Sequence, residues 1–157
     1  MLDPAIIAAI LWAVILAGAG ALLTDIGPWY RDLKKPRWQP PDWLFGPAWT
    51  IILGLAAWAA ILSWSEATSP SDQAIILSVY GANFLLHLLW SPLFFRYQRP
   101  DWALVEVVFL WLSVLAMLIM AWRFTPLAGA MILPYFLWVS FAAVLNARIV
   151  QLNRPFG

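Results

Sequence analysis

Five long apolar runs, separated by short polar gaps, occupy most of this sequence. They cover residues 5–23, 44–62, 74–95, 102–122 and 127–145. Each is close to the roughly 20 apolar residues that a helix needs to cross the hydrocarbon core of a bilayer. The chain is 64% hydrophobic and 11% charged, whereas a soluble domain carries about 25% charged residues. The bilayer is therefore the expected solvent, and the lack of polar–apolar alternation argues against transmembrane strands.

We predict an all-α membrane protein with a single domain over residues 1–157. Its architecture should be a five-transmembrane-helix bundle with a Trp/Pro-rich loop between helices 1 and 2. The helices are expected at about residues 5–24, 44–64, 74–96, 101–123 and 126–149. The first residues lack the basic region of a secretory signal, so we expect the first helix to be retained.

The basic residues predict the orientation of the chain in the membrane. Eight of the nine Lys and Arg residues lie after the first run, after the third run or in the tail, and only Arg123 lies on the opposite side. The positive-inside rule therefore predicts an integral multi-pass protein with its N-terminus outside and its C-terminus inside. An odd number of spans agrees with this prediction.

The sequence gives no evidence for nucleic-acid binding, disulfides, metal sites or dedicated catalytic residues. The net charge of +1 gives no case for nucleic-acid binding, and the absence of cysteine excludes disulfides and thiolate metal sites. His87 is the only histidine; it could bind a haem iron, but a lone buried histidine is more commonly a packing residue. No nucleophile–base pair is present, so we predict no dedicated catalytic residues and no metal site.

The gap after the first run is rich in aromatic rings and proline. Tryptophan and tyrosine favour the membrane interface, which explains one or two of these rings. Proline fixes φ and removes a donor, so the segment should be extended and stiff. We interpret it as a lid that folds back over the mouth of the bundle. The rings are Trp29, Tyr30, Trp38, Trp43 and Trp49, and the prolines are Pro36, Pro40, Pro41 and Pro47.

Two helix faces carry polar and aromatic side chains at helical spacing. Polar groups are costly in lipid, so these faces should point into the bundle. Together they predict an aromatic cavity with a few hydrogen-bonding groups, as in small-molecule sites. The faces are Asn83, His87 and Trp90 in the third run, and Tyr135, Trp138 and Ala142 in the fifth.

A stripe of alanines recurs every fourth residue from Ala5 to Ala21 in the first run. Small residues let another helix approach closely. The stripe therefore indicates either packing inside the bundle or a homodimer contact.

Three motifs resemble one known family. Residues 29–49 have the form W-Y-x-x-L-x-K-P-x-W-x-P-P-x-W-x-F-x-x-A-W, residues 90–95 read W-S-P-L-F-F, and residues 134–138 read P-Y-F-L-W, followed by Leu145-Asn146. Together they resemble the TspO/MBR family, which comprises the tryptophan-rich sensory proteins of bacteria and the mitochondrial translocator protein, or peripheral-type benzodiazepine receptor. The resemblance covers nearly the whole chain and indicates a bacterial member, in a bacterial membrane.

The resemblance implies a membrane receptor or carrier that binds a porphyrin, protoporphyrin IX or haem, beneath the first loop and requires no cofactor. It also implies a homodimer and, as further ligands, sterols and isoquinoline- or benzodiazepine-type drugs. The ligand-lining positions that it implies are Tyr30, Trp38, Phe45, Trp49, Asn83, His87, Trp90, Trp138 and Ala142.

The sequence also allows two alternative functions. One is enzyme-like, light-dependent degradation of protoporphyrin IX, for which the resemblance implies Trp49 and Trp138; the other is a ligand-responsive regulatory or stress scaffold. Asn83 and His87 stand where the family usually has Gln and Asn, which changes the hydrogen-bonding pattern. Ala147 replaces the tyrosine of the animal sterol motif, so we do not predict sterol binding from that motif.

Overall fold

The computed structural model describes residues 1–157 and contains helices but no strands. Five helices are long and apolar enough to cross a membrane, so the predicted five-helix membrane bundle is confirmed. The long helices are α1 (Pro4–Leu23), α3 (Phe45–Glu66), α4 (Pro70–Ser91), α5 (Pro100–Phe124) and α6 (Pro126–Asn153). The short ones are α2 (Pro28–Asp32), η1 (Asp42–Leu44) and the π-helical turn η2 (Pro92–Arg96), which continues α4.

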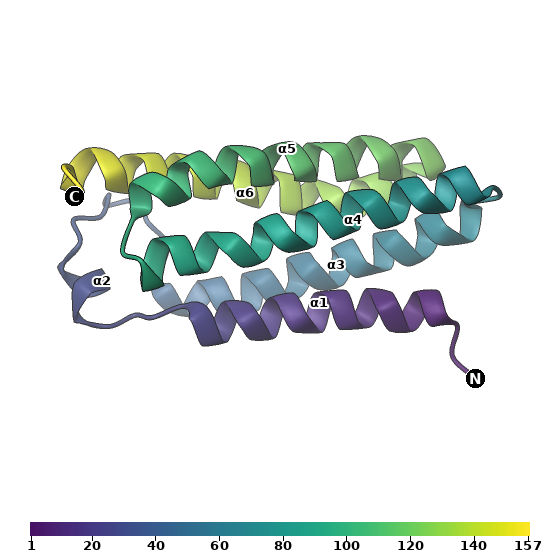
Figure 1. Cartoon of the computed structure of the whole chain (residues 1–157), viewed down its shortest axis with the longest axis horizontal. Coiled ribbons are helices and arrows are strands. Elements are labelled where there is room, and N and C mark those ends of the chain that lie inside the picture. Colours follow the sequence, from purple (N-terminus) through teal and green to yellow (C-terminus); the bar gives the residue numbers. More distant parts are fainter.

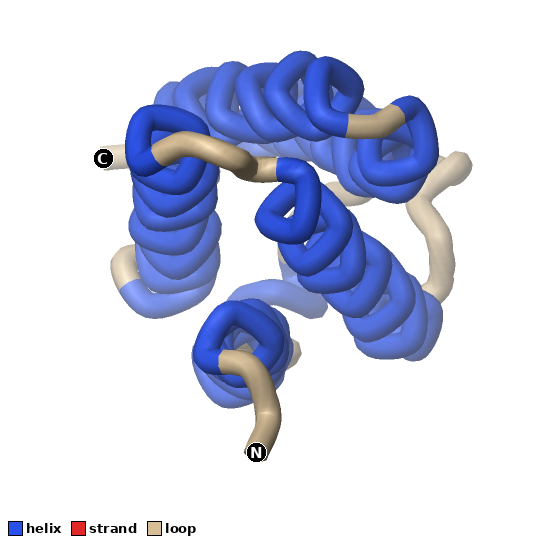
Figure 2. Tube along the Cα trace, turned by 90° about the vertical axis from the view of Figure 1, so that its right-hand side faces the viewer, coloured by secondary structure: helices blue, strands red, loops and turns tan.

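The long helices lie side by side along one axis (Figure 1). The N-terminus lies at one end of the bundle, whereas α2 and the C-terminus lie at the other. Helices α5 and α6 form the most extensive pair, and α1 packs mainly on α3. Seen along the bundle, α1 stands at its edge (Figure 2). The connection between α1 and α3 therefore lies at the same end as the C-terminus.

Proline starts most of the long helices. It occupies the first turn of α1, α4, α5 and α6, where its fixed φ suits the helix and its missing N–H leaves no bond unmade. Helix α4 starts at Pro70, before the predicted residue 74, because Ser69 Oγ accepts a hydrogen bond from Asp72 N at 3.1 Å. Helix α6 continues past the predicted residue 149, to Asn153. Both differences lie at helix ends that contain polar residues. The length of an apolar run does not predict such ends.

Hydrogen bonds between helices accompany the apolar packing. Tyr80 Oη donates to the carbonyl of Ala56 at 2.6 Å, and Trp12 Nε1 donates to the carbonyl of Tyr80 at 3.3 Å. Ala56 is fully buried, and Tyr80 and Trp12 are buried as well. In lipid these polar groups have no water to bond to, so the contacts join α1, α3 and α4.

The aromatic connection is not extended throughout, which corrects the prediction. Pro28 starts the short helix α2 directly after Gly27. The connection then folds back over the bundle end, where Trp29 lies edge-on to Phe94 with ring centroids 5.9 Å apart. Lys34 N donates to Asn153 Oδ1 and Asn153 Nδ2 donates to the Lys34 carbonyl, both at 2.8 Å. These paired bonds attach the connection to the end of α6.

Candidate ligand-binding cavity

A cavity of about 450 Å³ lies between the α1–α3 connection and the long helices. Of its 27 lining residues, 18 are hydrophobic, and all five long helices contribute to the wall. Small-molecule sites typically occupy about 300–1,000 Å³ and combine apolar walls with a few polar groups. The cavity therefore has the size and lining of a site for a mostly apolar ligand.

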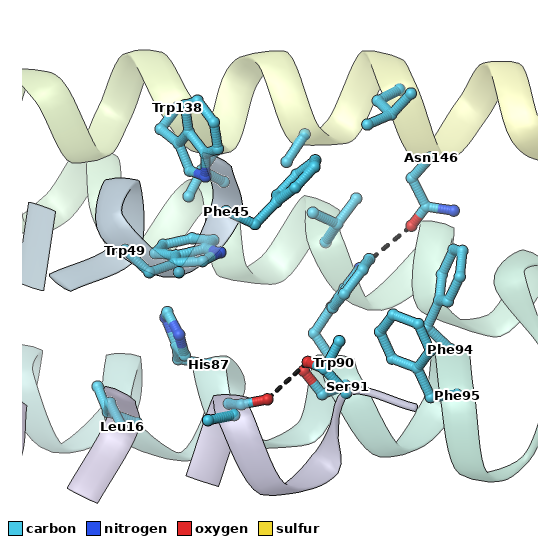
Figure 3. A pocket seen from close by; sticks show the side chains of 18 of the residues that line it. Leu16, Phe45, Trp49, His87, Trp90, Ser91, Phe94, Phe95, Trp138 and Asn146 are labelled. Atoms are coloured by element: carbon cyan, nitrogen blue, oxygen red, sulfur yellow. Dashed lines mark hydrogen bonds between the residues drawn. The ribbon is translucent and has the colours of Figure 1, made fainter. Parts of the chain in front are cut away.

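The cavity brings together seven of the nine predicted site residues. Trp49 is the central ring: its centroid lies 4.9 Å from that of His87 and 6.2 Å from that of Trp138, both edge-on. Phe45 completes this cluster, 5.7 Å from Trp138 (Figure 3). The seven are Tyr30, Phe45, Trp49, His87, Trp90, Trp138 and Ala142.

Two predicted site residues do not line the cavity. Trp38 is 48% exposed and packs edge-on against Phe141 at 5.7 Å. Asn83 is fully buried and donates to Ser113 Oγ at 3.0 Å and to Tyr135 Oη at 3.1 Å. Tyr135, expected on a cavity-lining face, is fully buried as well and does not line the cavity. Asn83 and Tyr135 instead form a polar layer behind His87, whose Nδ1 lies 2.6 Å from Tyr135 Oη.

The connection holds its own polar groups at the cavity mouth. Tyr30 Oη donates to Asp42 Oδ1 at 3.1 Å and accepts from Gln39 Nε2 at 3.0 Å. Burial, with the nearby Asp42 carboxylate, raises the pKa of Tyr30 to about 12, so the phenol stays neutral at physiological pH. Lys35 Nζ donates to the Tyr30 carbonyl and lies 4.3 Å from the centroid of its ring. Lys35 is therefore engaged within the connection.

Trp90 is fixed at the opposite wall by Asn146. Its Nε1 donates to Asn146 Oδ1 at 3.1 Å (Figure 3), and Asn146 Nδ2 donates to the Pro100 carbonyl at 2.9 Å. The Trp90 ring stacks on Phe94 with centroids 4.9 Å apart. Asn146 thus joins α4, the start of α5 and α6 at one point and sets the position of a cavity ring.

Two buried polar atoms of lining residues have no hydrogen-bond partner. They are Nε1 of Trp138, a donor, and Oε1 of Gln39, an acceptor. Figure 3 shows the Trp138 nitrogen directed toward Phe45 and Trp49. An unpaired polar group costs about 1–3 kcal/mol when it is buried.

Helices α1 and α5 also line the cavity, although the sequence did not predict that they would. Ala17, Gly20 and Ala21 line the cavity from α1, and Val107 and Leu110 from α5. The alanine stripe was the available signal for α1, because its small side chains leave room beside that helix. Aliphatic residues such as those of α5 carry no such signal, since every spanning helix has many.

Comparison with known proteins gives a consistent result. The TspO/MBR family matches residues 6–152. Protein CrtK of Rhodobacter capsulatus is 35% identical over 141 residues, which cover 90% of this chain and 88% of that protein. The tryptophan-rich protein TspO of Chlorobaculum tepidum is 34% identical, over 90% of this chain and 89% of its own length. The translocator protein of Ovis aries is 36% identical over 80% of this chain and 75% of its own.

The family match covers the bundle from α1 to the end of α6. It therefore includes the aromatic connection and every helix that walls the cavity. The chain belongs to the TspO/MBR family.

Proposed function

We propose that this protein is a membrane receptor or carrier that binds porphyrins in the cavity beneath the α1–α3 connection. Family membership supports a receptor- or transporter-type role in a membrane. The observation that carries the porphyrin proposal is the cavity wall, in which the rings of Phe45, Trp49, Trp90 and Trp138 surround one apolar space. A porphyrin is flat and apolar, and aromatic side chains pack on such rings by stacked or edge-on contacts.

The connection also offers cations for the two propionates of a porphyrin. Lys35 is engaged with Tyr30, which leaves Arg31, Lys34 and Arg37, all exposed, as partners for carboxylates. Arginine binds carboxylates through two parallel hydrogen bonds, so Arg31 and Arg37 suit this role best. In this arrangement the ring enters the apolar cavity and the charged groups stay at its mouth.

Titration of the detergent-solubilised protein with protoporphyrin IX tests the proposal. We expect saturable quenching of tryptophan fluorescence, with binding weakened about tenfold by Trp138→Ala, because an aromatic contact and its buried area are lost. Tyr30→Ala should weaken binding as well, by releasing the connection. Trp58→Ala is the matched control, since Trp58 is 59% exposed and does not line the cavity. Linear quenching, or equal affinities in all variants, would argue against a specific site.

Light-dependent breakdown of the porphyrin is a second candidate, because Trp49 and Trp138 both line the cavity in edge-on contact. Repeating the titration under illumination in air separates the two functions. A receptor or carrier returns the porphyrin unchanged. A degrading protein converts it to a new pigment, and loses this activity in Trp138→Phe.

We propose that the N-terminus faces outward. The end of the bundle that carries the α1–α3 connection and the C-terminus also carries eight of the nine Lys and Arg residues. The chain has no cysteine, so single substitutions report accessibility without background. In intact spheroplasts a membrane-impermeant maleimide should label Ser71→Cys but not Gln151→Cys; both residues are exposed, at opposite ends. The reverse labelling would reverse the orientation.

A further inference from the structure

We propose that His87 Nε2 binds the metal of a metalloporphyrin, so that the cavity takes haem-type ligands through a metal–nitrogen bond. This inference rests on the proposed function, because it assumes that a porphyrin occupies the cavity. It adds a specific ligand atom and a preference for the metallated ring.

His87 is placed as a metal ligand would be. Its side chain lines the cavity beneath Trp49 (Figure 3). Its Nδ1 is 2.6 Å from Tyr135 Oη, whereas no protein group bonds to Nε2. Histidines that bind metals almost always bond through their second nitrogen to a protein group, which fixes the tautomer and the ring orientation. Tyr135 supplies that second bond.

The polar layer behind His87 contains a complete donor chain for the required tautomer. In the tautomer that leaves Nε2 unprotonated, His87 Nδ1–H donates to Tyr135 Oη, and Tyr135 O–H donates to Asn83 Oδ1 at 3.3 Å. Asn83 Nδ2 donates to Ser113 Oγ at 3.0 Å, and Ser113 O–H donates to the Leu110 carbonyl at 2.7 Å. Each group donates to the next, and the lone pair of Nε2 remains free. If Tyr135 donates to His87 instead, Nε2 carries the proton and cannot bind a metal.

No other lining residue offers a nitrogen or sulfur ligand for the metal. The wall contains no methionine and the chain no cysteine, so sulfur ligands are absent. The Tyr30 hydroxyl is bonded to Asp42 and Gln39, and the Asp42 carboxylate accepts from Tyr30. The Trp138 indole nitrogen is a donor only. His87 is thus the lining residue with a free nitrogen lone pair, and imidazole is a common haem ligand.

The experiment is a titration of the purified protein with ferric haem, followed by absorption and electron paramagnetic resonance spectroscopy. We expect the spectrum of an iron bound by one imidazole. The variant His87→Gly should lose this spectrum, and added imidazole should restore it. Restoration also shows that the variant retains a folded cavity. A haem spectrum that is the same in His87→Gly and in the unmodified protein would overturn the inference.

Tyr135→Phe tests whether the polar layer positions His87. Tyr135 does not line the cavity, so affinity for metal-free protoporphyrin IX should change little. Affinity for haem should fall about ten- to hundredfold, which is the usual effect of losing such a second bond. Equal losses for both porphyrins would indicate a purely structural role and contradict the inference.

The two porphyrins also separate the inference from the proposed function. Saturable binding of protoporphyrin IX without an imidazole-type haem spectrum would overturn the role of His87 and leave the proposed function standing. Absence of saturable binding for either porphyrin would overturn both.

Discussion

Replacing Asn146 with leucine is expected to lower the midpoint of thermal unfolding by roughly 2–12 °C, corresponding to about 1–3 kcal/mol. Asn146 is 1% exposed and bonds to both Trp90 Nε1 and the Pro100 carbonyl. Leucine has the same branched arrangement of side-chain heavy atoms but makes neither bond, which leaves Trp90 Nε1 unpaired inside the bundle. The measurement is thermal unfolding in detergent, followed by near-ultraviolet circular dichroism.

Gln151→Leu is the matched control for this change. Gln151 lies on the same helix and loses only an exposed hydrogen bond from Arg148, so its midpoint should stay close to that of the unmodified protein. In a Trp90→Phe background, which removes one donor, Asn146→Leu should cost less than it does alone. Equal costs in the two backgrounds would show that the Trp90–Asn146 bond does not contribute to stability.

The number and type of the long helices followed directly from the sequence, because membrane spans of about 20 apolar residues carry a strong signal. Helix ends were less predictable. Ser69 and Pro70 start α4 with polar residues that hydropathy counts against a helix. Hydropathy also did not predict the short helix α2. This helix starts at Pro28, directly after Gly27, through local backbone preference, without an apolar run.

The cavity was only partly predictable, since periodicity gives the face of a residue but not its depth. Asn83 and His87 share a face, but Asn83 lies in the buried polar layer whereas His87 lines the cavity. Trp38 lies in the aromatic motif, but the fold of the connection places it on Phe141 at the surface. Tyr135 was expected in the wall, and its hydroxyl instead joins Asn83 and His87. Depth depends on how the helices pack together, which no single run specifies.

The hydrogen bonds that hold the bundle together also position the cavity rings. Asn146 joins three helix segments and fixes Trp90, and Tyr135 joins α4 to α6 and fixes His87. In a membrane, apolar surface gives little preference for one helix arrangement over another, because lipid tails are equally apolar. Buried polar contacts therefore specify the arrangement, and variants at these positions should affect both stability and binding. A position far from the cavity should affect stability alone.

Gly129 lies far from the cavity, so a substitution there should affect stability alone. We expect Gly129→Leu to lower the unfolding midpoint by roughly 2–12 °C, because overpacking costs about 1–3 kcal/mol. A Cβ at Gly129 would lie 3.0 Å from Trp122 Cα and would collide with the Trp122 indole. The half-exposed ring can move aside, but the Trp122 backbone cannot, because Thr125 alone links α5 to α6. The extensive α5–α6 contact would have to separate.

Gly54→Leu is the control for this prediction, because a Cβ at Gly54, on the exposed side of α3, meets no atom within 4 Å. Leucine is a better helix former than glycine by roughly 1 kcal/mol, so this variant should be as stable as the unmodified protein or more so. Gly129 does not line the cavity. Folded Gly129→Leu protein should therefore bind protoporphyrin IX with unchanged affinity at low temperature. Equal midpoints for the two glycine variants would show that α5 and α6 can separate at their turn without loss of stability.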